Sequence, residues 1–315
     1  MPTITSPFPD RQTLTRGLSA VFNDNGDSRG PLTVVRREPA PHVTSFPCEI
    51  VRGRFEDGST VELFCKYANG GGACSHGQRG GVDYEIEVYR HVLQSSQAST
   101  PTFYGTYADR KAGSTWLILE YMKRSMAVGK VSDPAAMRQA AWWSARFHAE
   151  QEGWLASRSR PKLRVYDAAY YRGWARRTAR YARDWHQRFP WLRPLCKRLE
   201  EQLCALAEHP RTIIHGEYYP HNILFQRGAV RPVDWETAAI APGEIDLATL
   251  TDGWARKVRR ELEAEYVRTR WPKGPPPHFD GTVDLARIYV QLRWLGDQPE
   301  WTNEKGSLWR FQQLR

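Results

Sequence analysis

The sequence predicts an α+β fold with two lobes, a small β-rich lobe over residues 31–122 and a larger, mainly helical lobe over residues 123–315. The first observation is that strand patterns concentrate in the first part of the chain. The second is that patterns with a helical period fill most of the remainder. The third is the length of 315 residues, which suffices for two modest domains or one bilobal unit.

The N-terminal segment, residues 1–30, is rich in Pro, Asp, Asn and Gly and has one short apolar patch from Leu18 to Phe22. These residue types favour turns and irregular backbone. We therefore expect a loosely ordered start with one helical turn. Its first residues lack a basic region and an apolar core, so we expect no signal peptide.

The small lobe is predicted from strand patterns and one helical pattern. The strand patterns alternate or are β-branched, and they lie at residues 32–36, 49–55, 61–67 and 115–121. Residues 56–59, Glu-Asp-Gly-Ser, join the second and third strands as a hairpin turn. Residues 82–94 show apolar positions at helical spacing, and the chain breaks again near Met122.

The larger lobe is predicted from helix starts and helical periods. Asp133 can cap and Pro134 can open a helix that runs to about Glu150. Asp167 can cap a second helix, with an aromatic stripe at the 3.6-residue period, that reaches about Phe189. Further helices are expected at residues 195–208, 244–255, 257–270 and 280–296.

Composition excludes some classes of protein. The chain is 41% hydrophobic and 25% charged, and no apolar run is long enough to span a bilayer, so we expect no membrane partner. The five cysteines are scattered and form no Cys-x-x-Cys pair. We therefore expect reduced thiols in a cytoplasmic protein and no zinc site.

The most informative stretch is His-Gly-Glu-Tyr-Tyr-Pro-His-Asn-Ile-Leu-Phe at residues 215–225, followed by Val-Asp-Trp-Glu from residue 233. Its carboxylate, amide and carboxylate groups are Glu217, Asn222 and Asp234, each next to an apolar segment that predicts a short strand. A loop and hairpin of this kind can gather oxygen ligands, which Mg²⁺ prefers. The order of the three groups is the arrangement that kinases use for phosphoryl transfer.

These motifs resemble the aminoglycoside phosphotransferase and choline kinase family, small-molecule kinases with a protein-kinase-like fold. The family pattern of His-Gly-Asp, four residues, Asn, a strand and an Asp matches at every position except Glu217. Residues 241–248 resemble the family's Gly-Pro turn followed by Asp-Leu-Ala. The resemblance covers about residues 30–300 and implies a bilobal kinase-like fold that uses ATP or GTP with Mg²⁺.

The resemblance implies a role for each motif residue. Asp234 would bind a cation that bridges the β- and γ-phosphates, and Asn222 would bind the same or a second cation; two turn-capping residues are the alternative. Glu217 would accept or orient the proton of the acceptor hydroxyl. Since its stem is one methylene longer than that of Asp, the site either places the hydroxyl further back or has lost turnover.

Nucleotide binding is expected from the small lobe. Lys66, at the end of an apolar strand, would hold the α- and β-phosphates and pair with Glu85, with Glu87 as the alternate partner and a surface lysine as the alternative reading. Thr44 and Ser45 lie in the turn expected to cover the nucleotide, where an ordinary loop is the alternative. From Glu120 to Met122, backbone groups would contact adenine. The glycine run at 69–81 does not have the phosphate-loop pattern.

Other polar residues of the motif region are expected to have structural roles. His215 would brace the catalytic loop, Asp246 would hydrogen-bond the backbone of that loop, and His148 would be packed in a helix. Glu236 is close enough in sequence to Asp234 to contact metal-bound water.

Charge patterning bears on the acceptor. Residues 1–122 carry 12 Lys or Arg and 13 Asp or Glu, whereas residues 123–315 carry 33 and 22, a net charge of +11. A polycationic aminoglycoside is therefore disfavoured, and we expect a neutral or anionic hydroxyl acceptor, either a small molecule or a peptide. A solvated basic face is the alternative reading.

The sequence is compatible with three functions. The first is an ATP- and Mg²⁺-dependent phosphotransferase. The second is a nucleotide-binding pseudokinase or scaffold, which the exchange at Glu217 motivates. The third is nucleic-acid binding through the arginines of residues 158–198, with Trp174, Tyr181 and Trp185 as stacking groups; their helical spacing is typical of a core and disfavours this function. The sequence leaves the oligomeric state open.

Overall fold

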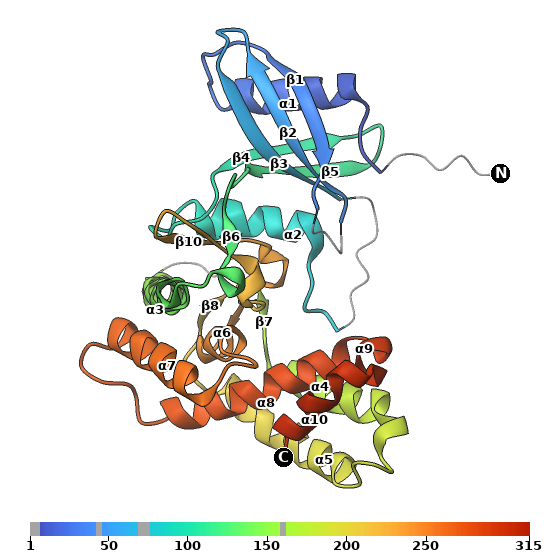
Figure 1. Ribbon diagram of the computed structural model, residues 1–315, viewed down its shortest axis with the longest axis vertical. Helices are drawn as coiled ribbons and strands as arrows, with labels where there is room; N and C mark the ends of the chain where they lie inside the picture. Colours follow the sequence, from blue (N-terminus) through green and yellow to red (C-terminus); the bar gives the residue numbers. More distant parts are fainter. Residues whose placement is uncertain (1–6, 42–45, 69–75, 158–161) are drawn as a thin grey trace, which may run out of the picture. The chain divides into compact units, whose positions relative to one another are not determined.

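The computed structural model describes residues 7–41, 46–68, 76–157 and 162–315 and divides the chain into two compact units (Figure 1). The N-terminal unit contains most of the chain up to Ser125. The C-terminal unit begins at Met126 and also includes the described residues 76–78 and Ser96–Ala98. The first unit is β-rich and the second mainly helical, which confirms the predicted α+β fold.

The N-terminal unit is built on a five-stranded antiparallel sheet in the order β1-β2-β3-β5-β4. Its strands are β1 (Leu32–Pro39), β2 (Cys48–Phe55), β3 (Thr60–Ala68), β4 (Phe103–Asp109) and β5 (Ser114–Glu120). Helix α1 (Arg11–Asp24) packs against the sheet, and the side chains between them form the core of this unit (Figure 1).

The prediction of a loosely ordered start is wrong, because α1 is a regular helix of 14 residues. Asp10 caps it by accepting a hydrogen bond from the Thr13 backbone at 2.9 Å. The buried face includes Leu14, Leu18 and Val21. These positions are spaced for one helical face, so burial against the sheet stabilises a helix that turn-forming neighbours obscure in the sequence.

Two features of the N-terminal unit differ from the prediction. The helix expected at 82–94 is α2 (Gly81–Val88) continued by a π-helical turn (Tyr89–Leu93). Strand β4 was not predicted. Its register shifts between Phe103 and Gly105, and Gly105 has φ 137°, so a bulge interrupts the alternation that would have revealed the strand.

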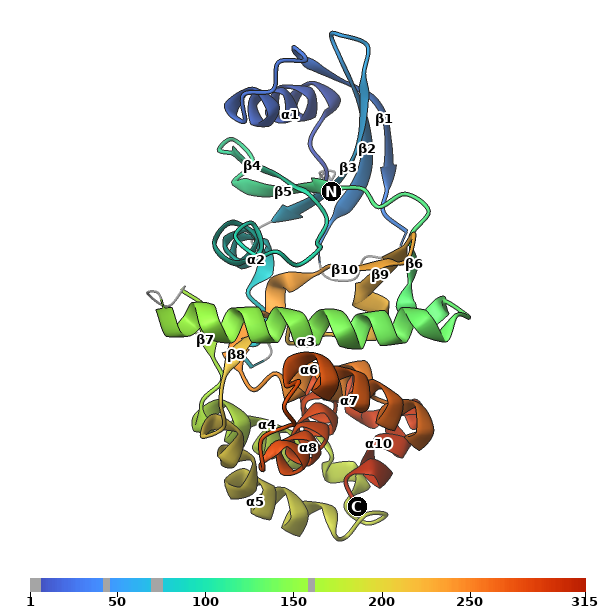
Figure 2. The same ribbon diagram turned by 90° about the vertical axis from the view of Figure 1, so that its left-hand side faces the viewer.

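The C-terminal unit contains long helices and two small sheets (Figure 2). The helices are α3 (Pro134–Ser157), α4 (Ala168–Tyr181), α5 (Leu192–Gln202), α6 (Glu244–Leu250), α7 (Arg256–Arg270), α8 (Phe279–Asp297), α9 (Pro299–Asn303) and α10 (Leu308–Gln313). One sheet has the order β10-β9-β6 and the other β7-β11-β8. The strands are β6 (Met126–Ala127), β7 (Arg164–Val165), β8 (Thr212–Ile214), β9 (Ile223–Gln226), β10 (Ala229–Pro232) and β11 (Ala239–Ala241).

The predicted helix starts are confirmed at two positions. The Asp133 carboxylate accepts from the Ala135 backbone at 2.8 Å, and Asp167 accepts from the Tyr170 backbone at 2.8 Å. The second helix ends at Tyr181, earlier than expected. Beyond it the aromatic residues Trp185 and Phe189 pack on Phe311 of α10, which turns the chain before the prolines are reached. Helices α9 and α10 were not predicted.

In the described ranges no helix has the length and apolar character needed to cross a bilayer. Of the cysteines in those ranges, Cys65 and Cys196 are buried and Cys204 is partly buried, while the Cys48 thiol donates to the Phe46 carbonyl at 3.4 Å.

Candidate functional site

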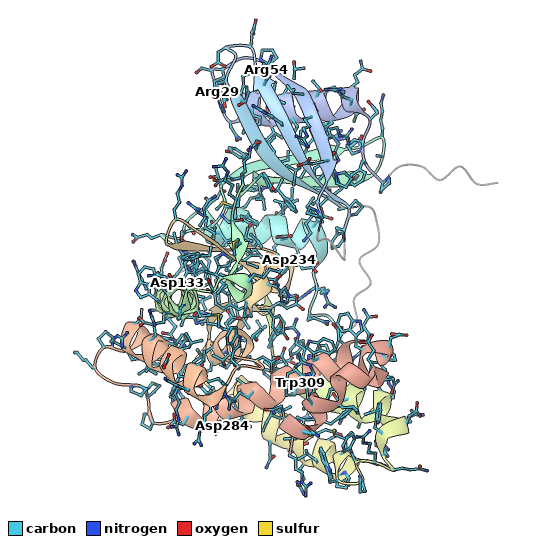
Figure 3. All side chains as sticks on the ribbon, in the orientation of Figure 1. Arg29, Arg54, Asp133, Asp234, Asp284 and Trp309 are labelled. Atoms are coloured by element: carbon cyan, nitrogen blue, oxygen red, sulfur yellow. The ribbon has the colours of Figure 1, made fainter. Side chains whose placement is uncertain are left out.

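The motif residues lie on the loop after β8 and on the β9–β10 hairpin of the C-terminal unit. Asn222 ends the loop, and its Nδ2 donates to the backbone carbonyl of Glu217 at 3.0 Å. The Val233 backbone N–H donates to the Asn222 carbonyl at 2.9 Å, directly beyond the pairing of Ile223 with Pro232. The hairpin therefore delivers Asp234 one residue beyond the contact with Asn222, the residue that closes the loop. Asp234 is labelled in Figure 3.

The backbone of Asp234 has an uncommon conformation. Its φ and ψ are 68° and 61°, in the left-handed region. Among the described residues other than glycine, φ is positive only at Arg124, Arg227 and Asp234. Such a conformation costs about 1–3 kcal/mol and persists where the surrounding structure enforces it, which is common at functional sites.

Asp246, in the first turn of α6, braces the loop. One carboxylate oxygen accepts the backbone N–H of His215 at 2.7 Å, and the other accepts that of Gly216 at 2.9 Å. Gly216 has φ +84°, and a Cβ there would lie 2.4 Å from the Thr237 carbonyl oxygen, so only glycine fits this loop. The structural roles predicted for Asp246 and His215 are consistent with these contacts.

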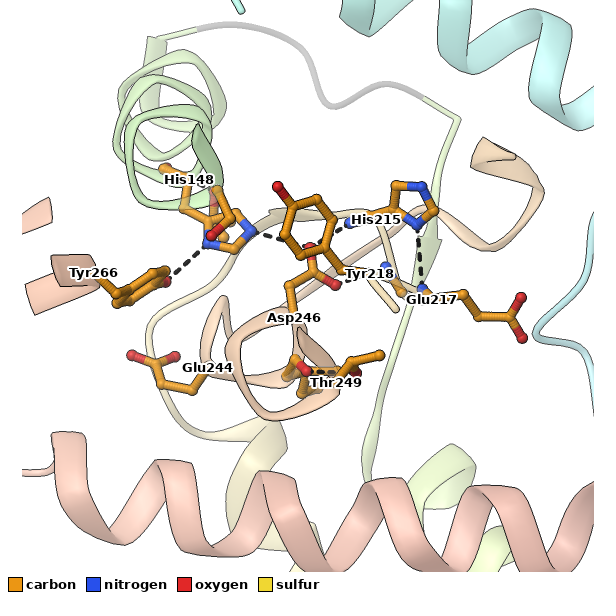
Figure 4. A network of polar contacts seen from close by, with 12 residues as sticks. His148, His215, Glu217, Tyr218, Glu244, Asp246, Thr249 and Tyr266 are labelled. Atoms are coloured by element: carbon orange, nitrogen blue, oxygen red, sulfur yellow. Dashed lines mark hydrogen bonds and ion pairs between the residues drawn. The ribbon is translucent and has the colours of Figure 1, made fainter. Parts of the chain in front are cut away.

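His148 on α3 joins the same network (Figure 4). Its Nε2 lies 3.2 Å from the Asp246 carboxylate, and its Nδ1 lies 2.8 Å from the Tyr266 hydroxyl. Burial lowers the pKa of His148, and this outweighs the opposite effect of Asp246. The neutral ring then donates from Nε2 to Asp246 and accepts at Nδ1 from Tyr266, so His148 is a packed residue, as predicted.

The sequence prediction missed Arg293, which lies on α8. Its Nη1 donates to the Gly216 carbonyl and its Nη2 pairs with Oε1 of Glu217. The side chains of Arg293 and Glu217 are only 4% and 14% exposed. Burial alone would lower the pKa of Arg293, but the negative charge of Glu217 helps to hold it well above its ordinary value. The sequence signal that could have indicated its role is an arginine set among the apolar residues of a predicted helix.

The carboxylate of Glu217 extends away from the Asp246 side of the loop (Figure 4). The loop is thus held by two buried groups with different targets. Asp246 accepts from its backbone N–H groups, and Arg293 donates to one carbonyl and to the side chain of Glu217.

Lys66 and Glu85 form a buried ion pair within the N-terminal unit. Lys66 Nζ on β3 lies 2.7 Å from Glu85 Oε2 on α2, and the two side chains are 8% and 2% exposed. The predicted pairing is confirmed. The alternate partner, Glu87, instead contacts Arg90 and His91 on the exposed side of the helix.

The other residues predicted to bind nucleotide have different outcomes. Glu120 ends β5; its Oε2 accepts from the backbone N–H and the hydroxyl of Thr102, and its own backbone N–H donates to the Thr102 carbonyl at 2.8 Å. The Met122 carbonyl accepts from the backbone and hydroxyl of Ser125. Thr44 and Ser45 lie outside the described residues.

The basic segment is partly neutralised by its surroundings. On α4, Arg172 and Arg176 pair with Glu201 and Glu200 of α5, and Arg177 donates to the Gly296 carbonyl at 2.7 Å. Trp174, one of the suggested stacking groups, is fully buried. The aromatic stripe is therefore core at this position, which argues against nucleic-acid stacking.

Asn222 and Asp234 can supply oxygen ligands to a cation. Since the Asn222 Nδ2 is committed to the Glu217 carbonyl, its Oδ1 is the atom that remains for a ligand. Within the described residues, no group of three or more His, Cys, Asp or Glu side chains converges as a metal site. A cation here would therefore depend on one carboxylate, one amide and substrate oxygens, as Mg²⁺ sites for phosphates do.

The sequence profile of the phosphotransferase enzyme family matches residues 75–276, which is more than half of the chain. No curated protein matches the chain significantly.

Solved structures of similar fold are phosphotransferases and choline kinases. The GDP complex of wild-type aminoglycoside 2'-phosphotransferase-IIIa has a TM-score of 0.60 at 14% identity, with 97% of each chain covered. Choline kinase LicA from Streptococcus pneumoniae has a TM-score of 0.57 at 14% identity, with 96% of this chain and 97% of that chain covered. Spectinomycin phosphotransferase APH(9)-Ia, in complex with ADP and spectinomycin, has a TM-score of 0.55 at 14% identity, with 97% and 93% covered. The predicted kinase-like fold is confirmed.

Proposed function

The chain belongs to the phosphotransferase enzyme family, and from this premise we propose that it transfers the γ-phosphoryl group of ATP or GTP to a hydroxyl group of a small molecule or peptide. The single observation that carries the proposal is that hydrogen bonds join Asn222 to Glu217 and to Val233, the residue before Asp234, on one loop and hairpin. Solved structures of the same fold contain GDP, AMP or ADP, which supports a nucleotide substrate.

The nucleotide contacts are proposed from the motif residues of each unit taken by itself. Lys66, oriented by Glu85, binds the α- and β-phosphates. The backbone from Glu120 to Met122 contacts the base, and Thr44 and Ser45 remain candidates for covering the phosphates. Asn222 and Asp234 bind Mg²⁺, which when bound neutralises charge on the β- and γ-phosphates.

In the proposed transfer step Glu217 accepts the proton of the acceptor hydroxyl. The acceptor oxygen attacks the γ-phosphorus, the bond from that phosphorus to the β–γ bridging oxygen breaks, and the nucleoside diphosphate leaves with the electron pair. The proton of the acceptor hydroxyl passes to Glu217, which orients the hydroxyl before the attack.

We place the acceptor among neutral or anionic hydroxyl compounds. The net charge of +11 over residues 123–315 supports this. A second support is Arg293, because its buried charge balances that of Glu217, the carboxylate assigned to the acceptor. A polycation such as kanamycin, which the similar structure of APH(2")-IIIa contains, would gain little from a neutralised carboxylate.

The test is a nucleotide-depletion screen with the full chain, Mg²⁺ and either ATP or GTP. The hydroxyl compounds include neutral sugars, acidic peptides, choline, kanamycin and spectinomycin. We expect one class of neutral or anionic compound to be phosphorylated, with loss of transfer in Asp234→Ala. Stabilisation by Mg·ATP without transfer to any compound or to water would favour the pseudokinase instead. Transfer that persists in Asp234→Ala would contradict the site.

A further inference from the structure

Arg293 on α8 contacts two consecutive residues of the motif loop, Gly216 and Glu217. We propose that Arg293 is a positioning residue for phosphoryl transfer, which holds the carboxylate of Glu217 in the place where it meets the acceptor hydroxyl. The inference rests on the proposed function, because it concerns the group to which that function assigns the acceptor proton.

The contacts of Arg293 are suited to this role. Two nitrogens of one planar guanidinium bind two consecutive residues of the loop, Nη1 at the Gly216 carbonyl and Nη2 at the Glu217 carboxylate. A rigid fork with two such contacts fixes the direction of the Glu217 side chain relative to its own backbone. A single contact to either group would leave that direction free.

Because Arg293 is buried, it favours a negatively charged side chain at position 217. Arg293 is 4% exposed and cannot release its proton, so it requires an anionic partner in the folded chain. On α8 it is followed by the buried Leu295 and preceded by the buried Tyr289 and Leu292. In these apolar surroundings the anion that the guanidinium contacts is the Glu217 carboxylate from the loop after β8.

The length of Glu217 explains why such a group is needed. Glutamate has one methylene more than aspartate, which moves the carboxylate by about 1.5 Å and adds a rotatable bond. An error near 1 Å in the position of a catalytic group can reduce the rate about 100-fold. Arg293 removes the added freedom, so Glu217 and Arg293 act as a matched pair. An aspartate at position 217 would end short of the guanidinium.

A matched control exists in the same unit. Arg310 on α10 is also a buried arginine in an ion pair, 2.9 Å from Asp252, and it donates to Gln291 at 2.9 Å. Its ion-pair and hydrogen-bond partners, Asp252 and Gln291, belong to neither the loop nor the hairpin, although its charge acts on Tyr219 of the loop. Loss of Arg310 therefore reproduces the loss of a buried guanidinium without the contact to Glu217.

The experiment measures phosphate release from Mg·ATP with water as the acceptor, which requires no knowledge of the natural acceptor. The variants are Arg293→Met, Arg293→Lys, Glu217→Asp, the double variant Glu217→Asp with Arg293→Met, and Arg310→Met. Thermal unfolding with and without Mg·ATP reports folding and nucleotide binding for each. If Arg293→Met does not fold, Arg293→Lys takes its place in both backgrounds.

We expect Arg293→Met to lower kcat about 100-fold while the KM for ATP stays unchanged. Arg293→Lys should recover part of the loss, and Arg310→Met should stay within about threefold of the native chain. With Glu217→Asp, which does not reach the guanidinium, the added Arg293→Met should change kcat by less than about threefold.

The inference is overturned if Arg293→Met keeps kcat within about threefold of the native chain, or if its loss is equally large with Glu217→Asp. A loss in Arg310→Met as large as that in Arg293→Met would also overturn it, since burial alone would then explain the effect. Failure of the proposed function has a different signature. In that case the native chain transfers phosphate neither to water nor to any hydroxyl compound of the screen, and both proposals fall together.

Discussion

His148 and Asp246 meet in the interior of the C-terminal unit, where Nε2 of the histidine lies 3.2 Å from a carboxylate that also accepts the backbone N–H groups of His215 and Gly216 (Figure 4). One buried carboxylate thus satisfies donors from α3 and from the loop after β8. The loop is therefore braced by contacts within the fold itself.

The first prediction concerns Asp246. Asp246→Ala leaves two backbone N–H groups of the loop and the His148 ring without their acceptor, which should cost about 3 kcal/mol or more in the free energy of unfolding. Asp284→Ala, at an exposed carboxylate of α8, should change it by less than about 0.5 kcal/mol. Urea denaturation of both variants is the measurement, and equal losses would contradict the role of Asp246.

The second prediction concerns pH and follows from the lowered pKa of His148. In the unfolded chain the ring titrates near pH 6.5, so below that pH the unfolded state binds a proton that the native state lacks. The contribution of His148 to stability is full above pH 6.5 and is lost as the pH falls toward the native pKa.

His148→Gln removes this titration while its amide can still donate to Asp246 and accept from Tyr266. The free energy of unfolding of the native chain, relative to this variant, should therefore fall between pH 7 and pH 5, by at most about 1.4 kcal/mol per pH unit. Urea midpoints across this range measure it. Parallel curves for the two chains would show that the ring is not held neutral.

Local sequence patterns predicted the features of the structure that are set by residues close together in the sequence. Lys66 lies near the end of an apolar strand and Glu85 lies on the next helix, and the family resemblance implied the ion pair that the structure contains. The order of Glu217, Asn222 and Asp234 likewise predicted the hairpin that joins them.

Contacts between distant segments could not be predicted in the same way. Arg293 follows Glu217 by 76 residues, and the sequence does not say which face of α8 will meet the loop. Helix α1 depends on burial of its apolar face against the sheet, which overrides the turn-forming residues around it. In β4 the bulge before Gly105 removed the alternation on which strand prediction relies.

The third prediction concerns the ion pair of the N-terminal unit. Lys66→Met leaves the Glu85 carboxylate buried without its cation, which should cost about 3–5 kcal/mol in the free energy of unfolding. Nucleotide affinity should fall as well, because the ammonium assigned to the phosphates is gone. Glu87→Gln, two residues further along α2 on its exposed side, should change neither quantity; calorimetry with Mg·ATP and urea denaturation are the measurements. Unchanged affinity in Lys66→Met would contradict the assigned role.

The fourth prediction compares two glycines with nearly the same backbone. Gly216 and Gly228 have φ of +84° and +78°, so alanine pays a left-handed penalty of about 1–2 kcal/mol at either position. At Gly216 the new Cβ would also lie 2.4 Å from the Thr237 carbonyl oxygen, whereas nothing lies within 4 Å of it at Gly228.

Gly216→Ala should therefore destabilise the chain by at least about 1–3 kcal/mol more than Gly228→Ala does. Phosphate release should fall only in Gly216→Ala, because the loop must shift to admit the methyl group. Thermal unfolding and the water-acceptor assay provide both readings. Equal effects on stability would mean that the loop yields easily at Gly216.

The fifth prediction uses the left-handed backbone of Asp234 to separate stability from activity. Alanine is usually more favourable than glycine in a folded chain, since glycine loses more conformational freedom on folding. At φ 68° and ψ 61° the order should reverse, because an alanine Cβ is strained there and glycine is not. Both variants lose the carboxylate and its contacts equally.

We therefore expect Asp234→Gly to be more stable than Asp234→Ala by about 1 kcal/mol, while neither transfers phosphate. Urea denaturation and phosphate release test the two halves separately. If alanine is the more stable of the two, the surrounding structure does not enforce this conformation and Asp234 is not held in strain for its function.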